Sequence, residues 1–501
     1  MLREPSSRPD QPLRTALDTP LPDSLAIGRG TALFVCGSCF HESRRVIELE
    51  LRLGSEPSRP MSHGMPRSDL YHRFGTPYAY SSGFWAIVPV PGRQRDETVE
   101  LGISVALDDG SRIAAPLKTI KLLGSNPTGG QRAQTWAGEG EDRRVAICMA
   151  TYDPPLDLFE RQIESIRAQS HDDWVCILSD DHSDPERFSR MEGLIGADDR
   201  FVVSRSSRRQ GLYRNFERSL EMAPPDVSFV ALCDQDDFWH RDKLTTLLDE
   251  IGAATIAYSD ARVVDRDGGL RSPTYWSARR NNWTNLTSLV LANSITGAAA
   301  LYRRDLLELA LPFPPVNFLF HDHWLAIIGR AAGDVAYVDR PLYDYVQHGG
   351  AALGHENAHV WSIRQRTTSD KARIFRRDPQ FFYEHWRATY FSEYCRTVHL
   401  ARVVLMRDPE RLRHRRRRAL ERLAAGERSP VRLGLRLAAR RARTVLGRDE
   451  TMHAEGRHLR ALAWSYLLRL TRPRPAPRAR LLPRDSSFPR FDWPRRRDQK
   501  A

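Results

Sequence analysis

The chain has 501 residues, of which 41% are hydrophobic and 28% charged, a length that predicts two or three domains and a composition typical of soluble proteins. No apolar run approaches the roughly 18 residues that a membrane-spanning helix needs, and the six cysteines form no disulfide framework. The net charge of +13 is unevenly placed, because residues 401–501 hold 29 Lys and Arg against 10 Asp and Glu.

The first 142 residues predict a polar leader, a small all-β domain and a linker. Residues 1–23 are rich in Pro, Ser, Asp and Arg, so they predict disorder, and they lack the apolar core of a secretory signal. In residues 24–125, short apolar or alternating runs separated by turn-forming residues predict a β-sandwich. Residues 126–142 are polar and Gly-rich, which is typical of a linker. The expected strands lie at 32–35, 46–53, 84–90, 99–105 and 113–123.

Residues 143–355 change to an alternation of strands and helices. Apolar runs at 145–149, 174–178 and 227–233 predict buried strands, and apolar spacings of three and four predict amphipathic helices between them. This alternation predicts an α/β fold with a Rossmann-like, mostly parallel sheet that helices cover on both faces. The carboxyl ends of parallel strands meet at one edge of such a sheet, where ligands bind.

Carboxylates follow two of these strands directly. Ser179-Asp-Asp-His-Ser-Asp184 ends one strand, and Asp234-Gln-Asp-Asp237 ends another. Carboxylates crowded at the end of a buried strand repel one another unless a cation lies between them, and Mg²⁺ and Mn²⁺ prefer oxygen ligands. The second stretch therefore predicts a metal and diphosphate site. Taken alone, it could equally be an acidic turn that caps the next helix.

Eight short motifs occur in order between residues 143 and 355. They are Thr151-Tyr-Asp153, Asp180-Asp-His-Ser183, Gln210-Gly-Leu-Tyr-Arg-Asn-Phe216, Asp234-Gln-Asp-Asp-Phe-Trp239, Thr296-Gly297, Pro312-Phe-Pro314, His321-Asp-His-Trp324 and Tyr345-Val-Gln-His348. In kind and order they resemble family-2 glycosyltransferases of the GT-A fold, especially rhamnosyltransferase-like members. Asp153 stands where that family usually has Asn, and His182 where Gly is common. The N-terminal β-domain resembles the β-sandwich accessory domains of some bacterial glycosyltransferases.

This resemblance implies inverting, metal-dependent transfer of a sugar from a nucleotide-diphosphate donor to a hydroxyl of a glycan or lipid-linked acceptor, in cell-envelope polysaccharide synthesis. It favours rhamnose as the sugar and Mg²⁺ or Mn²⁺ as the cofactor. It implies Asp322 as the general base, Asp236 and His348 as metal ligands, and Asp237 as a residue that orders the loop. The residues implied in nucleotide-sugar binding are Thr151, Tyr152, Asp180, Asp181, Arg209 and Asp234.

Several of these assignments have structural alternatives. Asp322 lies where a helix is expected to begin, so a capping role is its alternative, and Asp180 is as readily structural as ligand-binding. Arg209 is one of several nearby arginines that could contact a phosphate. His321 and His323 are expected to pack or to form hydrogen bonds. A fold that binds sugar without catalysis is a further alternative, against which the intact set of carboxylates argues.

Residues 356–470 predict basic amphipathic helices, and the Arg- and Pro-rich residues 471–501 predict disorder. Two apolar stripes with flanking arginines favour an anionic membrane surface as a partner, at the cytoplasmic face of the plasma membrane. The alternatives are a solvated or dimerising appendage and nucleic-acid binding through residues 411–418. No specific nucleic acid is expected, since a recognition motif and interleaved aromatic residues are missing. The stripes contain Leu435, Ala438, Ala439, Ala442, Val445 and Leu446, and Leu459, Leu462, Ala463, Tyr466 and Leu470.

Overall fold

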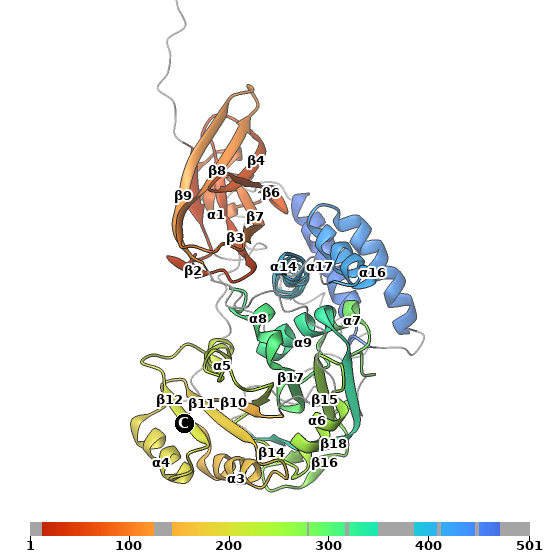
Figure 1. Cartoon of the computed structure of the whole chain (residues 1–501). Helices are drawn as coiled ribbons and strands as arrows, with labels where there is room; N and C mark the ends of the chain where they lie inside the picture. The colour runs from red at the N-terminus through yellow and green to blue at the C-terminus, as the bar shows by residue number, and fades with distance from the viewer. Residues whose placement is uncertain are drawn as a thin grey trace, which may run out of the picture.

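The computed structural model describes residues 13–124, 143–277, 280–315, 320–348, 385–407, 412–445 and 450–470 (Figure 1). The predictions of disorder for residues 1–12 and 471–501, and of a linker over residues 126–142, lie outside the described residues. Along the chain, a β-rich N-terminal part is followed by an α/β part and then by a helical C-terminal part (Figure 1).

Two antiparallel-rich sheets make up the N-terminal part. The first contains, in spatial order, β1 (Arg14–Leu17), β3 (Gly30–Phe40), β7 (Gly83–Pro91) and β6 (Ser62–Met65). The second contains β2 (Ser24–Ala26), β9 (Arg112–Leu123), β8 (Glu97–Leu107), β4 (Val46–Leu53) and β5 (Glu56–Ser58). Short helices α1 (Ser68–Phe74) and α2 (Pro77–Tyr80) connect β6 to β7. Alternate residues of both sheets, such as Val35 and Leu51, share one apolar core, as the strand alternation predicted.

The expected disorder of the leader is wrong from β1 onward. Thr15 pairs with Cys39 across the antiparallel β1–β3 ladder, and Leu13 and Leu17 pack against the core of the two sheets. Polar composition alone did not reveal this strand, because its stability comes from pairing with a partner about 20 residues away.

The α/β part is built on one long sheet. Its strands, in spatial order, are β12 (Phe201–Arg205), β11 (Trp174–Asp180), β10 (Val145–Thr151), β13 (Phe229–Cys233), β17 (Ala300–Arg303), β15 (Ile256–Asp265), β18 (Val335–Gln347) and β14 (Phe238–Trp239), with β16 (Leu270–Ser272) paired to β15. The first four strands are parallel, but β17 is antiparallel to both of its neighbours. The sheet is therefore mixed rather than mostly parallel as predicted, because an apolar run signals a buried strand without fixing its direction.

Helices cover this sheet on both faces. In Figure 1, α5 and α9 lie on the opposite side of the sheet from α3 and α4. The apolar spacing predicted for α3 places Phe159, Ile163 and Ile166 in the core. The bounds are α3 (Leu156–Arg167), α4 (Pro185–Ile195), α5 (Leu212–Glu221), α6 (Lys243–Glu250), α7 (Leu286–Leu291), α8 (Leu307–Ala310) and α9 (His321–Ala332), with 3₁₀ turns η1 (Tyr275–Ser277), η2 (Gly297–Ala299) and η3 (Arg304–Leu306).

The C-terminal helices join the β-rich part to the α/β part. Arg407, buried at the end of α14, donates hydrogen bonds to the carbonyls of Gly30 at 2.9 Å and of Leu309 at 2.8 Å. Trp85 of β7 packs edge-on against Phe391, with ring centroids 5.2 Å apart. None of the helices in the described segments is long and apolar enough to cross a membrane. The helical elements are η4 (Tyr390–Cys395), α14 (Arg396–Arg407), α15 (His414–Ala424), η5 (Ala425–Glu427), α16 (Pro430–Val445) and α17 (Ala454–Arg469).

Candidate active site

The predicted site residues gather where neighbouring strands end. The parallel register pairs Thr151 at the end of β10 with Asp180 at the end of β11, and Met149 of β10 with Cys233 at the end of β13. The Asp180 stretch and the Asp234–Asp237 loop therefore begin at the same edge of the sheet, on either side of the turn after β10. Long-range pairing of β10 with both neighbours brings these motifs together, although 50 residues separate them in sequence.

Asp180 and Asp181 are engaged inside the protein. The Thr151 hydroxyl donates to Asp180 at 3.2 Å, and the Ser183 backbone N–H donates to its other oxygen at 3.0 Å. Asp181 accepts the backbone N–H groups of Gln210 at 2.6 Å and Gly211 at 2.8 Å. Both carboxylates are buried, so they hold together the loops that surround the edge of the sheet.

Tyr152 and Arg209 face each other at the rim. The Arg209 guanidinium carbon lies 3.8 Å from the centre of the Tyr152 ring, and Arg209 is exposed while Tyr152 is half-buried. Gln235, a residue that the sequence analysis did not single out, binds the Tyr152 backbone twice. Its side-chain oxygen accepts the Tyr152 N–H at 2.8 Å, and its amide donates to the Tyr152 carbonyl at 3.3 Å. Gln235 thus ties the acidic loop to the turn after β10.

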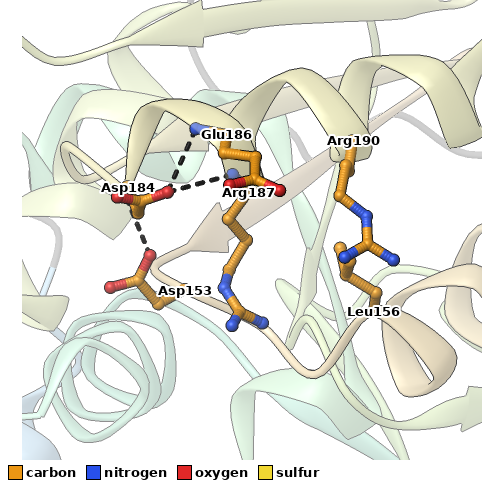
Figure 2. Close-up of a pocket in the computed structure, with 6 residues that line it drawn as sticks. All are labelled: Asp153, Leu156, Asp184, Glu186, Arg187 and Arg190. Carbon is orange, nitrogen blue, oxygen red and sulfur yellow. Dashed lines mark hydrogen bonds between the residues drawn. The ribbon is translucent and has the colours of Figure 1, made fainter.

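A pocket of about 310 Å³ lies beside this edge, between the turn after β10 and the start of α4 (Figure 2). Asp153, with a positive φ of 41°, accepts the Asp184 backbone N–H at 2.8 Å, and Asp184 in turn caps α4. Arg187 donates to the carbonyl of Pro154 at 2.8 Å. The lining residues are Asp153, Leu156, Asp184, Glu186, Arg187 and Arg190, and none of the predicted site residues is among them.

The three carboxylates of the acidic loop have different surroundings. Asp236 lies 2.7 Å from Nε2 of His348, so the structure brings together the two predicted metal ligands. Asp237 is buried and accepts the Val346 backbone N–H at 3.1 Å, which ties the loop to β18. Burial, together with the charges of Asp236 and Asp322, raises the pKa of Asp234 above its usual range. Gly297 lies against both Leu232 near the end of β13 and Asp322, which places Asp322 beside the end of the strand that precedes Asp234.

Lys243 is a buried cation behind this loop that the sequence analysis did not identify. Its ammonium group donates to the Ala298 carbonyl and lies 3.4 Å from the centre of the Trp239 ring. Burial lowers the pKa of Lys243 to about 7, while the charges of Cys233, Asp237 and Asp234 oppose this shift. A lysine at the first position of a helix is ordinarily exposed, so no sequence signal distinguished this one.

Asp322 lies in the first turn of α9, two positions past the capping residue. The N-cap of α9 is Phe320, and Asp322 accepts the N–H of His323 at 2.6 Å. Burial raises the pKa of Asp322 to about 6, and hydrogen bonds from the backbones of His323 and Gly297 and from the Asn293 side chain partly oppose this. A Cβ atom at Gly297 would lie 3.3 Å from Cβ of Asp322, so a larger residue would press on this carboxylate.

The two histidines that flank Asp322 are packed away from it. The His321 ring stacks on Phe216 with centroids 3.6 Å apart, and burial lowers its pKa to about 3, so the ring is neutral. His323 is buried, and its Nε2 lies 2.8 Å from the Leu289 carbonyl. Both have the packing and hydrogen-bonding surroundings that the sequence analysis expected of them.

Residues 146–309 match the family model described as Glycosyl transferase family 2. The chain carries a family-2 glycosyltransferase domain. The match includes the acidic loop and the two strands that precede the carboxylates. Asp322 and His348 lie beyond the matched residues, so their assignment depends on the geometry described above.

Other proteins similar to this chain are distant. An uncharacterized protein of Sinorhizobium fredii, y4gI, is 29% identical over 137 residues, which is 26% of this chain and 15% of that protein. The structure of S. aureus TarS 1–349 in complex with UDP-GlcNAc is 14% identical with a TM-score of 0.37, covering 65% of this chain and 91% of TarS. The complex of TarS 1–349 with UDP has 12% identity and a TM-score of 0.34, covering 57% and 92%. Because these TM-scores are low, the assignment of residues 146–309 to glycosyltransferase family 2 depends on the family model.

Proposed function

We propose that the protein is an inverting, metal-dependent glycosyltransferase that moves a sugar from a nucleotide-diphosphate donor to a hydroxyl of a glycan or lipid-linked glycan. The observation that carries this proposal is the proximity of the Asp236–His348 pair, Asp234 and Asp322 at one edge of a family-2 domain. Synthesis of a cell-envelope polysaccharide, with rhamnose as the transferred sugar, is the setting that the motifs favour. The cysteines of the chain are buried and free, which fits a cytoplasmic, reducing location.

The acidic loop fits a divalent cation. Asp236 and His348 supply a carboxylate oxygen and an imidazole nitrogen, and the second oxygen of Asp237 is buried with no hydrogen-bond donor among the described residues. The described part of the chain contains no group of three His, Cys, Asp or Glu side chains arranged as an ion site. Two protein ligands leave coordination positions for phosphate oxygens, an arrangement common for Mg²⁺. When bound, the cation would neutralise charge on the leaving diphosphate.

The other residues divide into donor contacts and an acceptor base. Tyr152 and Arg209 would hold the nucleoside at the rim, and Asp234 would hold the sugar or support the cation. Thr151, Asp180 and Asp181 would hold the loops at the edge of the sheet in place through their internal hydrogen bonds. Fewer residues would then contact the donor directly than the motifs implied. Asp322 would remove the proton of the acceptor hydroxyl as that oxygen attacks the sugar carbon, since an inverting displacement needs a base beside the acceptor.

A panel of nucleotide sugars tests this proposal directly. The donor is expected to raise the melting temperature of the full chain in the presence of Mn²⁺ and to lose most of this effect with EDTA, because a ligand that binds only the folded state stabilises it by mass action. The panel should include dTDP-rhamnose and UDP-GlcNAc. The stabilising donor is then assayed for transfer to glycan acceptors, with release of the nucleoside diphosphate as the readout. If every nucleotide sugar leaves the melting temperature unchanged, the proposal is wrong.

The pH dependence of transfer is expected to follow Asp322. A base acts when deprotonated, and the pKa of Asp322 is raised to about 6, so kcat/KM should fall below pH 6 and level off above pH 7. The measurement is kcat/KM from pH 5 to pH 8 at saturating Mn²⁺, with the melting temperature recorded at each pH as a control for unfolding. A profile that stays flat down to pH 5 would show that the acceptor base is not a carboxylate with a raised pKa.

A further inference from the structure

An apolar stripe on α16 faces away from the protein. Leu433 and Leu437 are buried, so they form the side of α16 that packs inward. The opposite side carries Val431, which is 58% exposed, and Leu435, which is 68% exposed. The stripe repeats at spacings of three and four residues, and its exposed members are Val431, Leu435, Ala438, Ala439 and Ala442.

The neighbouring helix α17 also carries exposed apolar side chains near its end. Figure 1 shows α16 and α17 side by side at one edge of the molecule, and Gly434 of α16 approaches Leu462 of α17. Tyr466 and Leu467 of α17 are exposed, as is Leu470, its C-cap residue. Five of the nine large apolar side chains that are exposed in the described residues lie on these two helices or at the C-cap of α17. Such a concentration marks an interaction surface, since exposed apolar residues are ordinarily scattered.

Exposed arginines are numerous on α16 and on the preceding helix α15. Within residues 412–445, Glu421 is exposed, and it pairs with Arg417 at 2.9 Å. Asp334, in the loop before β18, lies 3.4 Å from Arg413. The exposed arginines outnumber these two carboxylates, so the exposed side chains of this segment are mostly positive. The exposed arginines of this segment are Arg413, Arg415, Arg417, Arg418, Arg422, Arg428, Arg432 and Arg436.

An anionic lipid bilayer matches both features of this surface. Apolar side chains enter the boundary between headgroups and acyl chains, and arginines beside them meet the lipid phosphates. Nucleic acid would use the arginines but would leave the apolar stripe exposed to water. A second copy of this chain would bring the same arginines against each other at a symmetric contact. The arginines therefore favour the bilayer over a second copy of the chain, and the apolar stripe favours it over nucleic acid.

We propose that α15, α16 and the end of α17 form a docking face for an anionic lipid bilayer, with the Val431–Leu435 stripe inserted among the lipids and the exposed arginines on the phosphates. This goes beyond the proposed transfer reaction and does not depend on it, because no residue of this face belongs to the candidate active site. A bilayer at this face would hold the enzyme beside lipid-linked acceptors.

Vesicle sedimentation of the full chain tests this face. The wild-type protein is expected to pellet with phosphatidylglycerol–phosphatidylcholine vesicles at low salt, to pellet less at 0.5 M salt, and to stay in solution with pure phosphatidylcholine. Val431→Asp/Leu435→Asp should lower the apparent affinity at least 10-fold, because it places charge in the apolar stripe. The matched control is Leu270→Asp on β16, which changes a residue that is 59% exposed far from this face in sequence and should bind as wild type.

Several outcomes would overturn the membrane proposal. One is wild-type binding by the Val431→Asp/Leu435→Asp variant with an unchanged melting temperature. Another is equal pelleting with neutral and anionic vesicles, or no pelleting at all. Binding to duplex DNA without binding to vesicles would assign the arginines to nucleic acid instead. A concentration-dependent dimer that the double variant abolishes, without vesicle binding, would assign the stripe to a second copy of the chain.

Discussion

Asp322→Asn is expected to lower the rate of sugar transfer by about 10² to 10⁴-fold, which is the usual contribution of a general base. The amide can still accept the His323 N–H that Asp322 accepts at 2.6 Å, so the start of α9 should keep its structure. The amide of the variant cannot take a proton from the acceptor hydroxyl. Removing the carboxylate also relieves a negative charge that raises the pKa of Asp234, so metal and donor binding should persist or improve. The measurements are kcat for transfer and donor-dependent thermal stabilisation.

A matched control separates the chemical role of Asp322 from a general effect at a helix start. Asp305, in the 3₁₀ turn before α8, is an exposed acidic residue in a first helical turn, and Asp305→Asn should leave kcat unchanged. Loss of donor stabilisation together with kcat in Asp322→Asn would point to a structural role. Full transfer activity in Asp322→Asn would place the acceptor base elsewhere.

Asp236→Ala is expected to abolish high-affinity Mn²⁺ binding and to lower transfer by about 10²-fold or more. Asp236 is partly exposed and lies 2.7 Å from His348, whereas its neighbour Asp237 is buried and bonded to the Val346 backbone. Loss of a residue that merely orients a ligand costs about 10 to 100-fold in metal affinity, and loss of a ligand itself should cost more. Free Mn²⁺, followed by its electron paramagnetic resonance signal, gives the affinity without any need for the donor.

Asp237→Asn is the informative comparison for this experiment. It keeps an oxygen that can accept the Val346 N–H, but it places an amide where the second carboxylate oxygen of Asp237 is buried. We therefore expect a lower melting temperature with Mn²⁺ affinity close to wild type. If Asp237→Asn loses Mn²⁺ while Asp236→Ala retains it, the two carboxylates have exchanged roles relative to this proposal.

Much of the candidate site followed from local sequence. The apolar run before Asp234 predicted a buried strand with carboxylates at its end, and β13 (Phe229–Cys233) confirms the strand. The same reasoning placed Asp322 at the start of a helix, which α9 confirms. The ordered motifs predicted a family-2 glycosyltransferase, and the family model over residues 146–309 confirms this. These features depend on periodicity and on residues close together in the chain.

The tertiary structure alone decided how the motifs meet. Gln235 binds the Tyr152 backbone, and Lys243 is buried between the acidic loop and Ala298, yet nothing in their local sequence separates them from an exposed glutamine and lysine. The antiparallel direction of β17 and the pairing of β1 with β3 were missed for the same reason. Burial of a polar side chain and direction of a strand depend on partners that are distant in sequence. Apolar periodicity reports which side of an element is buried, and only the fold supplies the neighbour that covers it.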